Sequence, residues 1–187
     1  MGKIIRLGGD RVSLVIDLFE RAIREIKENY PNYQFMTHRD VAWMLQREIK
    51  VLIEKGGYPF EVYHSYPLGR ERPIIKDYEL VIVARGVSYR NLLSGEASVE
   101  LVVRLLFEPS RHRQDICEYS LPYVLSPRIA TEIKELRLLR ENRLAKETRF
   151  ILIDECSRHN INSIEWKHQS WGDYGDSGLN VSVLEVV

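Results

Sequence analysis

The stretch Asp77–Glu108, DYELVIVARGVSYRNLLSGEASVELVVRLLFE, decides the fold. It contains two runs rich in Val, Leu and Ile, Tyr78–Arg85 and Ser98–Phe107. Short runs of this composition are typical of strands buried in a sheet. The segment between them, Gly86–Ala97, is turn-prone and could close a hairpin. The sequence therefore predicts two neighbouring antiparallel strands at the centre of the domain.

Upstream of this stretch, the pattern predicts two helices and one strand. The first helix is expected from Val12 to Asn29, because apolar residues recur at helical spacing and Pro31 follows. The second begins at Thr37, where a capping-box-like sequence starts, and runs to about Glu54 before two glycines. Phe60–Tyr66 then reads as a strand.

Downstream, the pattern predicts one helix and two further strands. Ser126 and Pro127 are a typical helix start, and this third helix is expected to end near Ala145. Phe150–Asp154 and Leu179–Val187 read as strands. The order α-α-β-β-β-α-β-β predicts an α/β fold, a mixed β-sheet flanked by helices with one parallel crossover. We expect one domain over residues 1–187, because no repeat or linker divides the chain.

Composition limits the function classes. The 27 basic and 27 acidic residues cancel, so any binding of nucleic acid must depend on a local basic patch. No apolar segment approaches the length of a membrane span or a signal peptide. Cys117 and Cys156 form no disulfide framework and are typical of a reducing compartment. We therefore expect a cytoplasmic protein without membrane partners.

The element order resembles that of the PD-(D/E)XK, or restriction-endonuclease-like, nuclease superfamily over about residues 38–155, with the helix 12–29 packed on this core. Three stretches carry the resemblance. Asp77–Val83 resembles the strand with the first metal-binding acid, Leu105–Arg113 the end of the Glu-x-Lys strand, and Phe150–Glu155 the strand after the crossover helix. The resemblance implies a Mg²⁺-dependent phosphodiesterase acting on DNA, in which two carboxylates hold the metal and a Lys activates water.

The resemblance also assigns site positions. The first acid falls on Glu79, with Asp77 as a substitute on the same strand face. The second acid falls on Arg104, and the Lys position falls on Leu106. Another register recovers Glu100 as an acid but again places no Lys two residues later. We therefore expect a degenerate relative, with no tightly bound Mg²⁺ and no significant cleavage of duplex DNA.

Two further residues complete the expected site. Glu48 lies at helical spacing with Val41, Leu45 and Leu52, so it should face the site, form a structural ion pair or lie on the rim of a shorter helix. Arg104 stands where an acid is expected, and a guanidinium can neutralise the carboxylates that a metal would otherwise neutralise. We predict that Arg104 pairs with Glu79 or with Glu48.

Basic residues offer a candidate surface for DNA. These are Arg111, His112 and Arg113 after a strand, and Arg137 and Arg140 on the third helix. Acidic residues interleave on that helix, so the alternative is an ordinary solvated face. The second function class is accordingly a non-enzymatic interaction or assembly domain with no nucleic-acid role.

The C-terminal region carries two weaker signals. Trp166, Trp171 and Tyr174 would either stack on bases or cover a sheet edge or the contact within a homodimer. Cys156, His159 and His168 have spacing that zinc ligands can have, but no second pair completes a zinc site, so we interpret them as loop residues.

Overall fold

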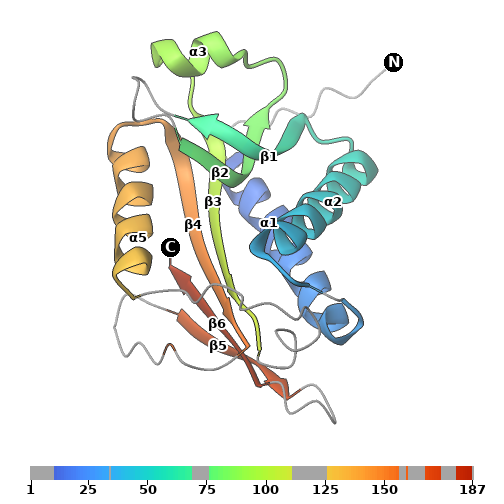
Figure 1. Ribbon diagram of the computed structural model, residues 1–187. Helices are drawn as coiled ribbons and strands as arrows, with labels where there is room; N and C mark the ends of the chain where they lie inside the picture. Colours follow the sequence, from blue (N-terminus) through green and yellow to red (C-terminus); the bar gives the residue numbers. More distant parts are fainter. Residues whose placement is uncertain are drawn as a thin grey trace.

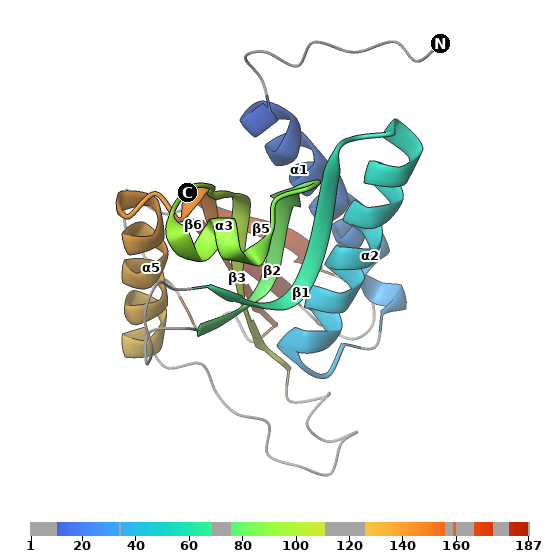
Figure 2. The same ribbon diagram turned by 90° about the horizontal axis from the view of Figure 1, so that it is seen from above.

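The structure is a computed structural model that describes residues 11–33, 35–68, 76–110, 126–155, 159, 167–173 and 180–186. It has three layers: helix α5 covers one face of a mixed sheet, and helices α1 and α2 cover the other (Figure 1). Seen from above, the sheet lies between these two helical layers (Figure 2). The mixed α/β architecture with a helix-flanked sheet is therefore confirmed.

The sheet has six strands in the order β1-β2-β3-β4-β6-β5. Only the β3 and β4 pair is parallel, and every other neighbouring pair is antiparallel. The bounds are β1 Phe60–Leu68, β2 Lys76–Ala84, β3 Val99–Glu108, β4 Ala145–Asp154, β5 Lys167–Asp173 and β6 Asn180–Val186. The antiparallel meander of the first three strands, with the fourth beside it after a crossover helix, was predicted and is confirmed.

The ends of helices α1 (Arg11–Asn29) and α2 (His38–Gly56) are explained by the residues next to them. A short 3₁₀ helix, Tyr30–Asn32, follows α1 and contains Pro31. Thr37 and Asp40 form the capping box of α2, and Gly57 ends this helix in the left-handed conformation (φ 60°). Both helices bury an apolar stripe against the sheet, so one hydrophobic cluster joins α1, α2 and the inner residues of β2 and β3.

Helix α5 (Ser126–Glu141) packs on the opposite face of the sheet. Its buried side chains, Ile129, Ile133, Leu136 and Leu139, join a second cluster with residues of β2, β3 and β4. Every residue of β3 is buried, because the strand lies between two neighbours and both faces are covered by helices. Polar side chains on β3 must therefore find partners within the protein.

Several predicted boundaries are wrong for identifiable reasons. The connection Gly86–Ala97 holds a short helix, α3 (Tyr89–Ser94), capped by the side chain of Ser88. The third helix ends at Glu141, not near Ala145, because Arg143 turns the chain with a left-handed backbone (φ 57°). β4 then begins at Ala145, five residues before the predicted Phe150, because Ala145 already pairs with Val99.

The predicted element order also lacked β5, which pairs with the terminal strand β6 at the far edge of the sheet. This strand, KHQSWGD, has few of the branched residues that mark strands. Among the described residues, no helix is long and apolar enough to cross a membrane.

Candidate functional site

The candidate site lies where β2 and β3 separate. Their paired register runs from Ile82↔Leu101 to Leu80↔Val103. One residue further, the same register sets Glu79 opposite Arg104. At this point the Glu79 carboxylate accepts a hydrogen bond from the backbone N–H of Leu105, at 3.3 Å. A side chain of β2 thus binds the β3 backbone just beyond the last paired residues of the two strands.

Arg104 bridges this end of the two strands. Its Nη1 atom donates to both carboxylate oxygens of Glu79, at 3.0 and 3.1 Å. The same nitrogen donates to the backbone carbonyl of Asp77, at 3.0 Å. The Arg104 side chain is only 6% exposed and that of Glu79 is 12% exposed. The predicted pairing of Arg104 with Glu79 is therefore confirmed, and it is a mostly buried contact.

A second carboxylate reaches Arg104 from helix α5. The Nε atom of Arg104 lies 2.5 Å from Oε2 of Glu132, whose side chain is 6% exposed. The other oxygen of Glu132 lies 3.7 Å from Nε of Arg128, one helical turn earlier on α5 and half exposed. The Arg104 guanidinium also lies over the ring of Tyr78, 5.4 Å from its centroid. Arg104 therefore joins β2, β3 and α5 through charge-assisted contacts.

The electrostatics agree with this geometry. Burial lowers the pKa of Arg104, but the hydrogen bond to Glu132 and the charge of Glu79 outweigh it, so the pKa is raised above its ordinary value. Burial, with the nearby charge of Glu135, raises the pKa of Tyr78 to about 12. Arg104 therefore stays charged and Tyr78 stays neutral at any physiological pH.

His38, the first residue of α2, is half-buried and interacts electrostatically with Glu79 and Arg104. Burial lowers the pKa of its imidazole, although the negative charge of Glu79 acts in the opposite direction. Arg39, Arg128 and Arg104 lower this pKa further. The N-terminus of α2 thus faces the same charges as the β2–β3 opening, and His38 stays neutral over most of the physiological range.

The chemistry available here is that of charge neutralisation. A metal-dependent hydrolase needs carboxylates free to ligate a cation and a group that activates water. Here the carboxylates of Glu79 and Glu132 both bind the guanidinium of Arg104. At the position that the resemblance assigns to Lys, Leu106 is 2% exposed and packs in the α5-side cluster. The guanidinium of Arg104 therefore neutralises both acids.

The other acids predicted for the site lie elsewhere. The side chain of Asp77 is exposed, and the contribution of this residue to the site is its backbone carbonyl. Glu48 is half-buried at one edge of the apolar stripe of α2, not at its middle, and its charge raises the pKa of Tyr33. The stripe instead follows Val41, Ala42, Leu45, Ile49 and Ile53. The carboxylates that bind Arg104 are those of Glu79 and Glu132, so the alternative pairing with Glu48 is wrong.

Glu100 is buried but serves another contact. Both of its carboxylate oxygens accept hydrogen bonds from Nζ of Lys146 on β4, each at 2.8 Å. Four residues separate Glu100 from Arg104 along β3, which corresponds to roughly 13 Å in an extended strand. Glu100 therefore makes a cross-strand ion pair at the other end of β3 and does not join Glu79.

The predicted basic surface is described only in part. Arg137 and Arg140 are exposed on α5. Arg111, His112 and Arg113 lie outside the described residues, as do Cys156, Trp166 and Tyr174. Within the described part of the chain, no group of three or more His, Cys, Asp or Glu side chains is placed to hold a metal ion.

A second buried polar cluster lies at the carboxyl ends of β3 and β4. Oε2 of Glu108 accepts a hydrogen bond from Nε2 of His159, at 2.7 Å. Asp154, paired with Glu108 across the two strands, accepts from the backbone N–H of His159 at 2.9 Å. Glu155 accepts from the hydroxyl of Tyr30, at 2.7 Å. His159 lies in a loop, as interpreted from the sequence, and it binds the ends of both strands. His168, interpreted in the same way, lies on strand β5 instead.

Glu132 is a site residue that was not predicted, although the sequence contains a signal for it. On α5 it lies three residues after Ile129 and one before Ile133, within the apolar stripe that continues to Leu136. A Glu within an apolar stripe requires a buried partner. Glu48 on α2 was expected to need such a partner, but the apolar stripe of that helix is offset from Glu48.

In comparisons with known proteins, the chain matches no family model, no curated protein and no solved structure. Any function assigned to it therefore depends on its own residues and contacts.

Proposed function

We propose that this chain is a restriction-endonuclease-like domain that has lost phosphodiester cleavage and works as a non-catalytic binding module. The observation that carries this proposal is the position of Arg104. Its guanidinium lies 3.0 Å from Glu79 and 2.5 Å from Glu132, at the point where β2 and β3 separate. A cation built into the chain thus satisfies the carboxylates that a nuclease would present to Mg²⁺.

The arrangement of the strands supports the relation to such nucleases. Glu79 on β2 and Arg104 on β3 face each other at the open end of an antiparallel pair, and a crossover helix then leads to the parallel strand β4. This is where the resemblance places the metal-binding acids. Under this assignment Glu79 keeps the first acid, Arg104 replaces the second acid, and Leu106 replaces the Lys.

The contacts of Arg104 support the loss of catalysis more strongly than a single missing acid would. Nε and Nη1 both donate to carboxylates, and Nη1 also donates to the Asp77 carbonyl. Displacing this side chain by a hydrated divalent ion would leave a buried guanidinium without partners, at a cost of several kcal/mol. Metal binding at Glu79 is therefore opposed by the native packing.

The test is a plasmid-nicking assay with Mg²⁺ or Mn²⁺, run beside calorimetric titration of the same ions. We expect no nicking above background and no saturable heat of binding for the native chain. The matched control is Glu79→Gln, which removes the acid but keeps its size. Metal-dependent nicking that is present in the native chain and disappears in Glu79→Gln would overturn the proposal.

Association with DNA is a second candidate, favoured by the exposed Arg137 and Arg140 on one surface of α5. The charges beside Glu79 are mixed, because Arg39, Arg104 and Arg128 there meet three carboxylates, those of Glu79, Glu132 and Glu135. If α5 contacts phosphates, Arg137→Gln with Arg140→Gln should weaken DNA binding and reduce its salt dependence. Binding that is absent, or unchanged in this variant, leaves a protein-interaction role, in the cytoplasm as the composition suggests.

A further inference from the structure

The pairing of β1 with β2 is interrupted at one position. Residues 60–64 of β1 pair with residues 80–84 of β2, and residues 66–68 pair with residues 76–78. Between these two groups, Ser65 pairs with no residue of β2 in the described register. We call the first group the inner part and the second group the outer part. The hydrogen-bonded ladder of these two strands therefore has two separate parts.

The interruption coincides with local strain. Ser65 has a left-handed backbone (φ 52°), which is strained for a residue with a side chain. Its hydroxyl shares a hydrogen bond with Nδ1 of His64, at 3.0 Å. The other ring nitrogen of His64, Nε2, is buried and has no hydrogen-bond partner in the part of the chain that the structure describes. The closed form of the chain thus carries unfavourable features at the junction of the two parts.

Both strands also turn over at this junction. Side chains alternate between the two faces of a strand, so residues an even number apart should share a face. Phe60 of β1 and Leu80 of β2 lie in the cluster with α1 and α2. Leu68 and Tyr78 are an even number of residues away on the same strands, but they lie in the cluster with α5. The outer part is therefore rotated relative to the inner part and packs on the other side.

Few backbone hydrogen bonds hold the outer part. The N–H of Arg85 donates to the carbonyl of Pro59, so the odd-numbered residues form the hydrogen-bonded pairs of this ladder. In the outer part the odd-numbered pair is Pro67 with Asp77, and proline has no N–H. On the other side of β2, the pairing with β3 ends at Leu80. This alternation leaves one ladder hydrogen bond, from the Asp77 N–H to the Pro67 carbonyl, among the described residues of the outer part.

Arg104 supplies contacts that the backbone does not. Its Nη1 atom donates to the Asp77 carbonyl, at 3.0 Å, which is the group that an N–H at position 67 would otherwise bind. Its guanidinium lies 5.4 Å from the ring centroid of Tyr78, and its Nε atom binds Glu132 of α5. One side chain of β3 thus joins the outer part to α5.

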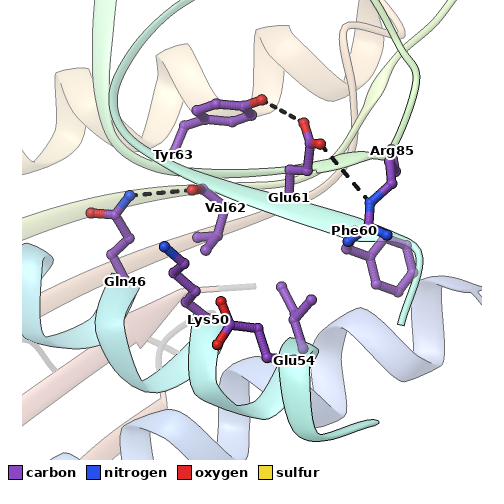
Figure 3. Close-up of a pocket in the computed structure, with 9 residues that line it drawn as sticks. Gln46, Lys50, Glu54, Phe60, Glu61, Val62, Tyr63 and Arg85 are labelled. Atoms are coloured by element: carbon purple, nitrogen blue, oxygen red, sulfur yellow. Dashed lines mark hydrogen bonds and ion pairs between the residues drawn. The ribbon is translucent and has the colours of Figure 1, made fainter. Parts of the chain in front are cut away.

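The inner part is held by different contacts. The amide Nε2 of Gln46 on α2 donates to the Val62 carbonyl, at 3.2 Å, and the Tyr63 hydroxyl donates to Glu61 (Figure 3). Residues 80–82 of β2 pair with β3 as well as with β1. None of these contacts involves a residue of the outer part. The two parts can therefore separate without loss of the bonds that hold the inner part to the sheet.

We infer that the outer part is a flap that opens away from the Arg104 site, with Ser65 and Glu79 as its hinge and Arg104 as the residue that holds it closed. Segments with few backbone hydrogen bonds open at a lower free energy than the core of a protein. Opening removes Asp77 and Tyr78 from the guanidinium, which keeps Glu79 and Glu132. The flap would thus control access to this ion pair. This inference does not rest on the proposed loss of cleavage.

Native-state amide exchange, followed by NMR in urea concentrations below the unfolding transition, tests the flap. Asp77 reports on the flap, and Val81, which the alternation bonds to Tyr63, reports on the inner part. Relative to its intrinsic rate, Asp77 should exchange at least ~100-fold faster than Val81. Its exchange should change little with urea, because a local opening exposes little surface, whereas that of Val81 should rise steeply.

Two matched variants distinguish a flap from a chain that unfolds as one unit. Leu68→Ala removes a flap contact that is lost in local opening and in global unfolding, so Asp77 and Val81 should both exchange faster by the same factor. Val62→Ala shortens a side chain of the inner part, so Val81 alone should exchange faster, by roughly three- to tenfold. Equal acceleration of both amides in Val62→Ala would contradict the inference.

Arg104→Lys tests the residue that holds the flap closed. An ammonium keeps the charge but lacks the planar fork that reaches Asp77, Glu79 and Glu132 together. Asp77 should exchange at least ~10-fold faster in this variant and keep its shallow dependence on urea. An unchanged rate at Asp77 would show that Arg104 does not hold the flap.

The native chain alone decides whether the flap exists, even if a variant fails to fold. Equal free energies of exchange and equal urea slopes at Asp77 and Val81 overturn the inference, because the two parts would then open together. The dispersion of the amide spectrum establishes that each variant is folded before its exchange is compared.

Discussion

Arg104 on β3 and Glu79 on β2 face each other directly beyond the last paired residues of their strands, with Nη1 of the arginine 3.0 Å from a carboxylate oxygen. Two strands that separate at this point would leave backbone groups without strand partners. The Glu79 carboxylate and the Arg104 guanidinium bind two of these groups, the Leu105 N–H and the Asp77 carbonyl. The side chains of this ion pair thus supply hydrogen bonds at the point where the backbone hydrogen bonds between β2 and β3 end.

Replacement of Arg104 by Ala should be among the most destabilising single changes in this chain. It leaves the carboxylates of Glu79 and Glu132, each at most 12% exposed, without their shared cation. We expect a loss of about 3–5 kcal/mol in the free energy of unfolding, measured by denaturant melts. Arg104→Ala combined with Glu79→Gln should cost clearly less than the sum of the two single changes. Additive effects would show that Arg104 does not compensate the charge of Glu79.

A divalent cation should rescue a variant in which Arg104 no longer supplies the positive charge. In Arg104→Gln, the carboxylates of Glu79 and Glu132 lose the guanidinium that they share. Mn²⁺ or Ca²⁺ should therefore raise the melting temperature of Arg104→Gln but not that of the native chain. The control is Arg104→Gln with Glu79→Gln, which should lose the rescue. An equal response of all three proteins would indicate nonspecific ion effects.

The imidazole of His38 should titrate below its ordinary pKa of 6.5, because burial disfavours its charged form. In Glu79→Gln this pKa should fall further, since the charge of Glu79 favours protonation. A lowered pKa means that the contribution of His38 to stability is complete above pH 6.5. It is lost as the pH falls through the lower, folded-state pKa. NMR titration of the ring protons checks this, and a pKa at or above 6.5 contradicts it.

Deprotonation of Tyr78 should cause part of the loss of folding stability at alkaline pH. Its folded pKa is raised from 10.0 to about 12 by burial, whereas the unfolded chain releases this proton near the ordinary value. Stability should therefore be intact below pH 10 and should decline as the pH rises toward 12. Tyr63 also titrates near 12, chiefly because its hydroxyl bonds to Glu61. Phenolate absorbance distinguishes the two, because Glu61→Gln should lower the pKa of Tyr63 toward its ordinary value and leave that of Tyr78 unchanged.

The meander and the Arg104–Glu79 pair could be predicted because both depend on the two-residue period of neighbouring strands. Once the runs around Glu79 and Arg104 are identified as adjacent antiparallel strands, their side chains need only share a face to meet. Glu100 shows the limit of this reasoning. It shares the strand face of Arg104, but its partner Lys146 comes from β4, whose start the sequence did not reveal.

The contacts that could not be predicted depend on how helices are placed against the sheet. Glu132 meets Arg104 only because α5 presents one particular side to β3, and that orientation is fixed by tertiary packing. Glu48 was misplaced for the same reason, since the buried side of α2 is centred on Leu45 and Ile49. The short helix α3 and the strand β5 have too little periodic apolar pattern to stand out from loops.

The parallel pairing of β3 with β4 also has a consequence for the order in which the protein folds. Val99 meets Ala145, so this contact closes a long loop, whereas the hairpin of β2 and β3 closes a short one. Contacts distant in sequence form slowly, so we expect the meander with α2 to assemble before α5 and β4 join it. Glu132 can then reach Arg104 only in this last step. A chain arrested before it would carry Arg104 on an uncovered face of the sheet, with one acid where the native state has two.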